Sequence, residues 1–118
     1  MLYIFSGLPG TGKTELSKYL AETLGAVYLR IDTIEQAMKE SGINEINGSG
    51  YFIACKLAED NLKAGLTVVA DSVNPLGHTR KDWRAVAIKI DKPYCDIEIS
   101  QDVTFCEACQ SNLEEHHH

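Results

Sequence analysis

A glycine-rich segment near the start of the chain has the residue types and spacing needed to hold phosphate groups. Its sequence is Gly7-Leu8-Pro9-Gly10-Thr11-Gly12-Lys13-Thr14, which matches the pattern GxxxxGK(S/T) at every fixed position. Glycines permit positive φ angles and let backbone N–H groups approach phosphate oxygens closely. Lys13 supplies a positive charge for the β- and γ-phosphates, which also makes it a candidate catalytic residue, and the Thr14 hydroxyl can ligate Mg²⁺. The segment predicts a nucleoside triphosphate site formed by residues 7–14, without separating a kinase from an ATPase or a GTPase.

Two aspartates follow apolar segments that are typical of buried strands. Asp71 comes directly after the apolar residues 67–70, a position from which a carboxylate can reach Mg²⁺ or its bound water. Asp32 comes directly after residues 26–31 and can either accept the proton of an acceptor hydroxyl or cap the helix that follows, and both roles can coexist. Arg30 is a further acceptor-side candidate, directed either toward phosphate or toward solvent.

The absence of one short motif bears on which nucleotide the chain binds. The guanine-recognition pattern Asn-Lys-x-Asp does not occur, because Asp91-Lys92-Pro93 lacks both the Asn and the second Asp. We therefore expect ATP rather than GTP, with Mg²⁺ as the accompanying cation.

The elements that must position these residues alternate between strand and helix patterns. Strands are predicted at 2–5, 26–31, 66–70 and 96–100, and helices at 13–24, 32–39, 51–62 and from Asn74-Pro75 onward. This alternation predicts an α/β fold, a three-layer sandwich with a parallel sheet of about four strands and helices on both faces. Ligands bind such sheets at the carboxyl ends of the strands, where Gly7, Asp32 and Asp71 would meet. An open edge of this sheet would favour a homo-oligomer.

Length and composition describe one small globular domain. The chain has 118 residues, of which 44% are hydrophobic and 24% charged. We assign residues 1–112 to a single domain and residues 113–118 to a remnant of a purification tag. The formal net charge of −6 argues against broad nucleic-acid binding and against attachment to an anionic membrane. The start of the chain has no basic leader and no apolar run is long enough to span a bilayer, so we expect a cytoplasmic location.

The remaining polar residues receive ordinary structural interpretations. Cys106 and Cys109 form a lone CxxC pair, and with Cys55 and Cys95 they are interpreted as reduced thiols. Arg80 and Arg84 are interpreted as one solvated helix face paired with Asp82 or other acids. Trp83 is predicted to lie in the core and His78 on the surface.

Together these motifs resemble the P-loop small-molecule and polynucleotide kinases. The similarity rests on residues 7–14, on Leu29-Arg30-Ile31-Asp32 opening a helix, and on residues 68–75 with Arg80 and Trp83 following. This group includes the kinase halves of polynucleotide 5′-hydroxyl kinases, chloramphenicol phosphotransferase and zeta-toxin-type kinases. The resemblance covers about residues 1–100 and implies transfer of the γ-phosphate of ATP to a hydroxyl of a small molecule or nucleotide end. It also implies that Asp32 is the base and that Asp71 lies on the acceptor and metal side.

The sequence departs from that group near its end. Relatives continue into an arginine-bearing lid, a fifth strand and a final helix, whereas residues 93–115 contain no basic residue. Three interpretations follow: a truncated chain, a natural short form, or a partner that supplies the missing parts. The alternative function is therefore a nucleotide-binding module or weak ATPase without kinase activity.

Overall fold

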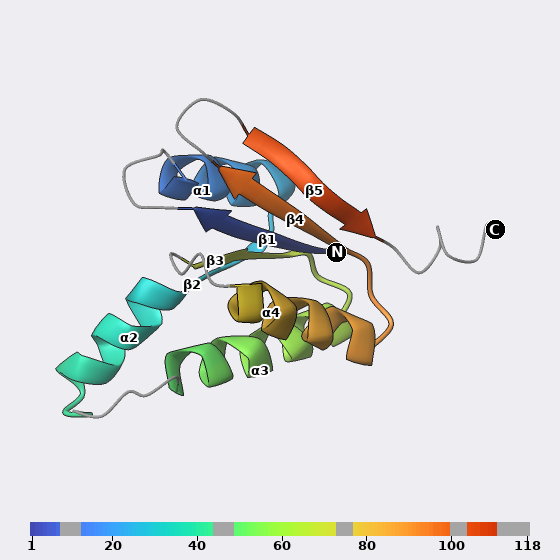
Figure 1. Ribbon diagram of the computed structural model, residues 1–118. Coiled ribbons are helices and arrows are strands. Elements are labelled where there is room, and N and C mark those ends of the chain that lie inside the picture. Colours follow the sequence, from blue (N-terminus) through green and yellow to red (C-terminus); the bar gives the residue numbers. More distant parts are fainter. Residues whose placement is uncertain (8–12, 44–48, 73–76, 100–103, 111–118) are drawn as a thin grey trace.

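The fold is an open sheet with helices on both faces (Figure 1). The computed structural model describes residues 1–7, 13–43, 49–72, 77–99 and 104–110. The elements along the chain are β1 (Leu2–Gly7), α1 (Lys13–Leu24), β2 (Val27–Arg30), α2 (Ile31–Glu40), α3 (Ser49–Lys63), β3 (Val68–Asp71), α4 (Gly77–Lys89), β4 (Tyr94–Ile99) and β5 (Thr104–Gln110).

The strand order within the described residues is β2-β3-β1-β4-β5. The first four strands are parallel, and β5 runs antiparallel to β4. Helix α1 covers one face of the sheet, α3 and α4 cover the other, and α2 extends beyond the end of β2 (Figure 1). The predicted α/β class with a parallel sheet is confirmed. The antiparallel strand β5 was not predicted, because Thr-Phe-Cys-Glu-Ala-Cys-Gln has neither a continuous apolar run nor a strict alternation.

The sheet separates two hydrophobic layers of unequal size. The layer beneath α3 and α4 contains these buried residues: Leu2, Ile4, Leu29, Ile31, Ala54, Ala58, Leu62, Val68, Ala70, Trp83, Val86 and Ala87. The layer beneath α1 contains Phe5, Ala21 and Val69, with Tyr3, Leu20, Ala26, Tyr28 and Ile97 packed against them. Successive side chains of a strand point to opposite faces, so the residues of β3 divide between the two layers. Trp83 is completely buried, which confirms its predicted place in the core.

The start of α2 differs from the prediction. The helix begins at Ile31, and its N-cap residue is Arg30, which has extended backbone angles and no side-chain capping bond. Asp32 therefore lies in the first helical turn, and its predicted role as an N-cap is wrong. The reason is that β2 passes directly into α2 with no connecting residue, which leaves Asp32 inside the helix, where its negative charge favours the positive helix end.

Arg84 is not part of a solvated face. It forms an ion pair with Asp96 of β4, whose side chain is only 1% exposed. The prediction failed because it considered charges on the same helix, whereas the partner comes from the strand that α4 covers. The side chains of His78 and Arg80 lie outside the described residues.

The prediction of reduced cysteines is wrong for Cys95, which is disulfide-bonded. Cys95 lies opposite Cys109 in the β4–β5 register, a placement created by the antiparallel strand that the sequence did not predict. Cys55 is a free thiol. Within the described parts of the chain, no helix has the length and apolar character that crossing a membrane requires.

Candidate active site

The phosphate-loop motif lies between the carboxyl end of β1 and the amino end of α1. Gly7, the last residue of β1, has a φ of 152°, an angle that a residue with a side chain rarely adopts. Helix α1 begins at Lys13, so its positive end is at the sheet edge where the motif lies. Residues 8–12 and the side chains of Lys13 and Thr14 lie outside the described residues. The strand before and the helix after the motif are those that a phosphate-binding loop requires.

Asp71 lies at the same edge as a buried carboxylate held by two hydroxyl groups. It is the last residue of β3 and is 1% exposed. Its Oδ2 atom accepts hydrogen bonds from Ser17 Oγ at 3.1 Å and from the Tyr28 hydroxyl at 2.8 Å. The two hydroxyl oxygens are themselves 3.0 Å apart. Helix α1 and strands β2 and β3 therefore meet at one carboxylate oxygen.

The hydrogen bonds explain how a charged group is accommodated inside the sheet. A buried carboxylate is tolerated only when its lone pairs receive hydrogen bonds. Burial raises the pKa of Tyr28 to about 12, and the hydrogen bond and negative charge of Asp71 act in the same direction. At neutral pH the Tyr28 phenol is consequently protonated, and it donates its hydrogen to Asp71.

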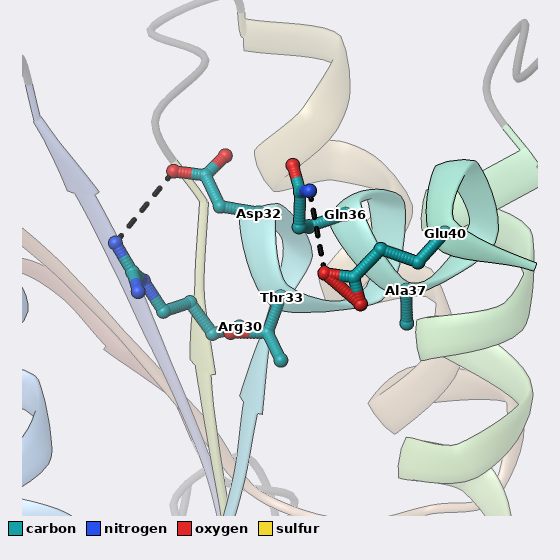
Figure 2. Close-up of a pocket in the computed structure, with 6 residues that line it drawn as sticks. All are labelled: Arg30, Asp32, Thr33, Gln36, Ala37 and Glu40. Atoms are coloured by element: carbon teal, nitrogen blue, oxygen red, sulfur yellow. Dashed lines mark hydrogen bonds and ion pairs between the residues drawn. The ribbon is translucent and has the colours of Figure 1, made fainter.

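Arg30 and Asp32 lie beside Asp71 and line an open pocket. Arg30 is opposite Asp71 in the β2–β3 register, and its guanidinium is 3.8 Å from the Asp32 carboxylate. Both side chains are accessible, with 39% of Arg30 and 45% of Asp32 exposed. The pocket has a volume of about 420 Å³ and is lined by Arg30, Asp32, Thr33, Gln36, Ala37 and Glu40. Figure 2 shows these residues at the junction of β2 and α2.

The lining of this pocket comes mainly from one side of α2. Asp32, Gln36 and Glu40 recur every four residues along the helix and therefore lie on one face. The Gln36 amide donates a hydrogen bond to the Glu40 carboxylate at 3.4 Å, drawn in Figure 2. The pocket thus presents two carboxylates, an amide, a hydroxyl and one guanidinium, all of which can hydrogen-bond to a polar molecule.

The structure brings Arg30, Asp32 and Asp71 to one edge, as the sequence predicted. It adds Ser17 and Tyr28, which the sequence analysis did not select. Ser17 gave no clear signal, because Leu16 and Leu24, which suggested the buried face of α1, are themselves exposed, whereas Ser17 and Ala21 are buried. Tyr28 gave no such signal, because aromatic residues are ordinary in strands.

The sheet edge contains a carboxylate, that of Asp71, that could bind Mg²⁺. Within the described residues, no group of three or more His, Cys, Asp or Glu side chains is placed to hold a metal ion. Mg²⁺ in kinase sites uses one or two carboxylates and completes its coordination with phosphate and water oxygens. Asp71 is placed to supply such a carboxylate beside the phosphate-loop motif.

Comparisons with known proteins agree with this arrangement. A family model described as an AAA domain matches residues 2–115 of the chain. Comparison with curated proteins yields no match.

Several solved structures share the fold. A candidate kinase from Chloroflexus aurantiacus has a TM-score of 0.73 and 20% identity, with 83% of this chain and 58% of that chain covered. APS kinase from Mycobacterium tuberculosis has a TM-score of 0.67 and 18% identity, with 83% and 73% covered. A gluconokinase from Sinorhizobium meliloti has a TM-score of 0.53 and 16% identity, with 81% and 55% covered.

The present chain thus spans 58% of the length of the Chloroflexus protein. At these identities the likeness establishes the fold alone. The family model, however, covers nearly the whole sequence, and the edge of the sheet carries the phosphate-loop motif beside a buried aspartate. The chain therefore belongs to the AAA domain family.

Proposed function

We propose that this chain is an ATP-dependent kinase that transfers the γ-phosphate of ATP to a hydroxyl of an acceptor bound in the α2 pocket. The observation that carries the proposal is the meeting of three groups at one sheet edge. The phosphate-loop motif follows β1, Asp71 ends β3, and Arg30 and Asp32 follow on β2 and α2. A donor site and an acceptor site at the same edge of one sheet are what phosphoryl transfer requires.

Each group has a part in the chemistry. Asp32 accepts the proton as the acceptor oxygen bonds to the γ-phosphorus, and the bond from that phosphorus to the β–γ bridging oxygen breaks to release ADP. Lys13 and the backbone amides of residues 7–14 hold the phosphates and offset their charge. Mg²⁺, when bound, neutralises charge on the β- and γ-phosphates, and Thr14 and Asp71 would hold it. Arg30 lies 3.8 Å from Asp32, a position from which its guanidinium can hold the Asp32 carboxylate in place.

The charges that line the pocket indicate which acceptors it favours. Both a small molecule and a nucleotide end are candidates. Asp32 and Glu40 place two carboxylates in the lining against the single guanidinium of Arg30. Like charges in one pocket repel an anionic ligand, whereas amide, hydroxyl and carboxylate groups accept hydrogen bonds from a polyol. We therefore expect uncharged or cationic hydroxyl compounds to be better acceptors than compounds that carry several phosphates.

The proposal is tested by an acceptor screen with γ-labelled ATP on the wild type and on Asp32→Asn. The panel contains polyols, amino alcohols, nucleosides and 5′-hydroxyl oligonucleotides. Loss of a general base lowers the rate by about 10²- to 10⁴-fold, so the variant should bind ATP normally and lose transfer. Glu35→Gln is the matched control, since Glu35 is on the same helix but outside the pocket lining.

The screen also separates the competing interpretations. Transfer at an unchanged rate in Asp32→Asn would remove that residue from the mechanism. ATP binding without transfer to any acceptor would favour a nucleotide-binding module, and hydrolysis without an acceptor would favour an ATPase.

Lys13→Ala should weaken ATP binding with little loss of fold, and an unchanged affinity would contradict the phosphate-loop assignment.

A further inference from the structure

The bonding of Asp71 is unusual in that two hydroxyls from different elements converge on a single carboxylate oxygen. Ser17 Oγ and the Tyr28 hydroxyl both bond to Oδ2, at 3.1 and 2.8 Å. A carboxylate with one oxygen held in this way has little freedom to rotate about its Cβ–Cγ bond. The two hydroxyls therefore fix the direction of the carboxylate by hydrogen bonding.

One hydroxyl comes from the helix next to the proposed nucleotide site, and the other comes from the strand next to the proposed acceptor site. Ser17 is on α1, which begins at Lys13 of the phosphate-loop motif. Tyr28 is on β2, which leads directly to Arg30 and Asp32 of the α2 pocket. The Ser17–Tyr28 distance of 3.0 Å joins the two donors to each other as well as to Asp71. The cluster therefore ties the nucleotide side of the sheet edge to its acceptor side.

We propose that Ser17 and Tyr28 are positioning residues that orient the Asp71 carboxylate toward the magnesium ion of bound Mg·ATP. The inference rests on the proposed function for its ligand, and it assigns roles to residues outside the phosphate-loop motif. In a site whose groups are held in place before binding, the cost of ordering them does not reduce the affinity. Removing either hydroxyl removes one of the hydrogen bonds that orient the carboxylate, and the contribution of Mg²⁺ to nucleotide affinity falls.

The test compares ATP binding by calorimetry in excess Mg²⁺ and in excess EDTA. The proteins are the wild type, Tyr28→Phe, Ser17→Ala and the double variant. We expect each single variant to lose about three- to tenfold of the Mg²⁺-dependent gain in ATP affinity, in keeping with the loss of one hydrogen bond to a charged group. Affinity measured in EDTA should stay the same, because the phosphate-loop residues are intact.

The matched control is Tyr3→Phe. Tyr3 and Tyr28 are both opposite Val69, on the two flanking strands β1 and β2, and both pack in the layer beneath α1. The same hydroxyl is removed at the same level of the sheet, so the control should retain the full effect of Mg²⁺. A purely structural role for Tyr28 would change the melting temperature and both affinities together, without changing their ratio.

The double variant supplies an independent readout. Since both hydroxyls act through the same oxygen, their effects on the Mg²⁺-dependent gain should not add. Unchanged ratios in both folded single variants would overturn the positioning role, and so would fully additive losses. Should Tyr28→Phe fail to fold, Ser17→Ala tests the same carboxylate from the α1 side. Absence of any Mg²⁺-dependent ATP binding in the wild type would overturn the proposed function as well, whereas changes confined to the variants bear on the positioning role alone.

Discussion

Two aspartates are buried in the described part of the sheet, and different groups bond to them. Asp96 is paired with the guanidinium of Arg84 on the α4 side. Asp71 receives hydroxyl hydrogen bonds from Ser17 and Tyr28 on the α1 side. A guanidinium offsets the charge of its carboxylate, whereas a hydroxyl supplies a hydrogen bond without a charge. The Arg84–Asp96 pair thus joins α4 to β4, and the two hydroxyls join α1 and β2 to β3.

This contrast predicts that Arg84→Ala destabilises the fold. The substitution removes a guanidinium that pairs with the Asp96 carboxylate, whose side chain is only 1% exposed. We expect a loss of about 2 to 4 kcal/mol in the free energy of unfolding, since Arg84 itself is partly exposed. Denaturant unfolding provides the measurement. Lys89→Ala on the same helix is the control, because its ion pair with Glu59 is exposed and should leave the stability unchanged. Equal losses in the two variants would contradict the structural role of the buried pair.

The Cys55 thiol should react slowly in the folded chain. Burial, aided by the negative charge of Asp82, raises the pKa of Cys55 from 9.0 to about 11. The thiolate fraction at pH 8 is therefore about 100-fold below that of the unfolded chain. Alkylation with iodoacetamide, followed by peptide mass spectrometry, measures the rate with and without denaturant. Similar rates in both conditions would show that the thiol is open to solvent.

The raised pKa of Cys55 also determines how its contribution to folding stability changes with pH. The folded state holds the Cys55 proton more tightly than the unfolded state, so this group's contribution to stability is present below pH 9. It is lost as the pH rises from 9.0 to about 11. Cys55→Ala should flatten the stability profile in that interval.

At the scale of the elements, α2 is attached to the core by fewer buried residues than α3. Only Ile31 and Met38 of its ten residues are buried, whereas α3 buries Gly50, Ala54, Ala58 and Leu62. The helix that lines the pocket therefore depends on few apolar contacts, and such segments open at low free energy.

Hydrogen exchange should accordingly be faster in α2 than in α3. Amide exchange measured by mass spectrometry or NMR gives opening free energies for both helices under identical conditions. An acceptor that binds the pocket should slow exchange in α2 more than in α3. Equal protection of the two helices in the unliganded chain would contradict the weak attachment inferred here.

The elements that the sequence predicted best are those with a continuous apolar run or a clear helical period. Strands β1 to β4 and helices α1 to α3 all fall within two residues of their predicted bounds, because burial dictates their patterns. Strand β5 escaped prediction because its apolar and polar residues follow no simple period, and its pairing depends on β4. The start of α2 was misplaced since local preference favours Asp as a cap, whereas the direct passage from β2 decides the actual boundary.

The candidate site likewise contains residues that the sequence predicted and contacts that it did not. The phosphate-loop motif and the aspartates after the strands are local patterns and were predictable. The contact of Tyr28 with Asp71 depends on β2 and β3 being neighbours in the sheet, and the pairing of Arg84 with Asp96 depends on α4 covering β4. Contacts of this kind follow from strand order, which no local pattern in a single sequence encodes.

At the scale of the whole molecule, stability rests mainly on the layer beneath α3 and α4. That layer contains the fully buried Trp83 and most of the large buried side chains, whereas the layer beneath α1 has three buried apolar residues and the Asp71 cluster. The division leaves the α1 side free to hold polar groups at a tolerable cost in stability.

Replacing a large buried side chain of the layer beneath α3 and α4 by alanine should lower the stability of the fold. Leu62→Ala removes a side chain that is 1% exposed in the larger layer, and we expect a loss of about 2 to 4 kcal/mol. Leu57→Ala is the control on the same helix, since Leu57 is 41% exposed and should lose less than about 1 kcal/mol. The fluorescence of Trp83, the single tryptophan of the chain, reports the unfolding of this layer. Comparable losses at the two leucines would contradict the burial pattern.

The strand order β2-β3-β1 sets the distance between the proposed nucleotide site and the proposed acceptor site. Neighbouring strands are about 4.8 Å apart, so the chain segments leaving β1 and β2 begin about 10 Å from one another, with β3 between them. A row of linked phosphoryl groups is long enough to cross this interval, and a single phosphoryl group is not. Under the proposed function, the spacing of the strands therefore favours a triphosphate donor over a monophosphate.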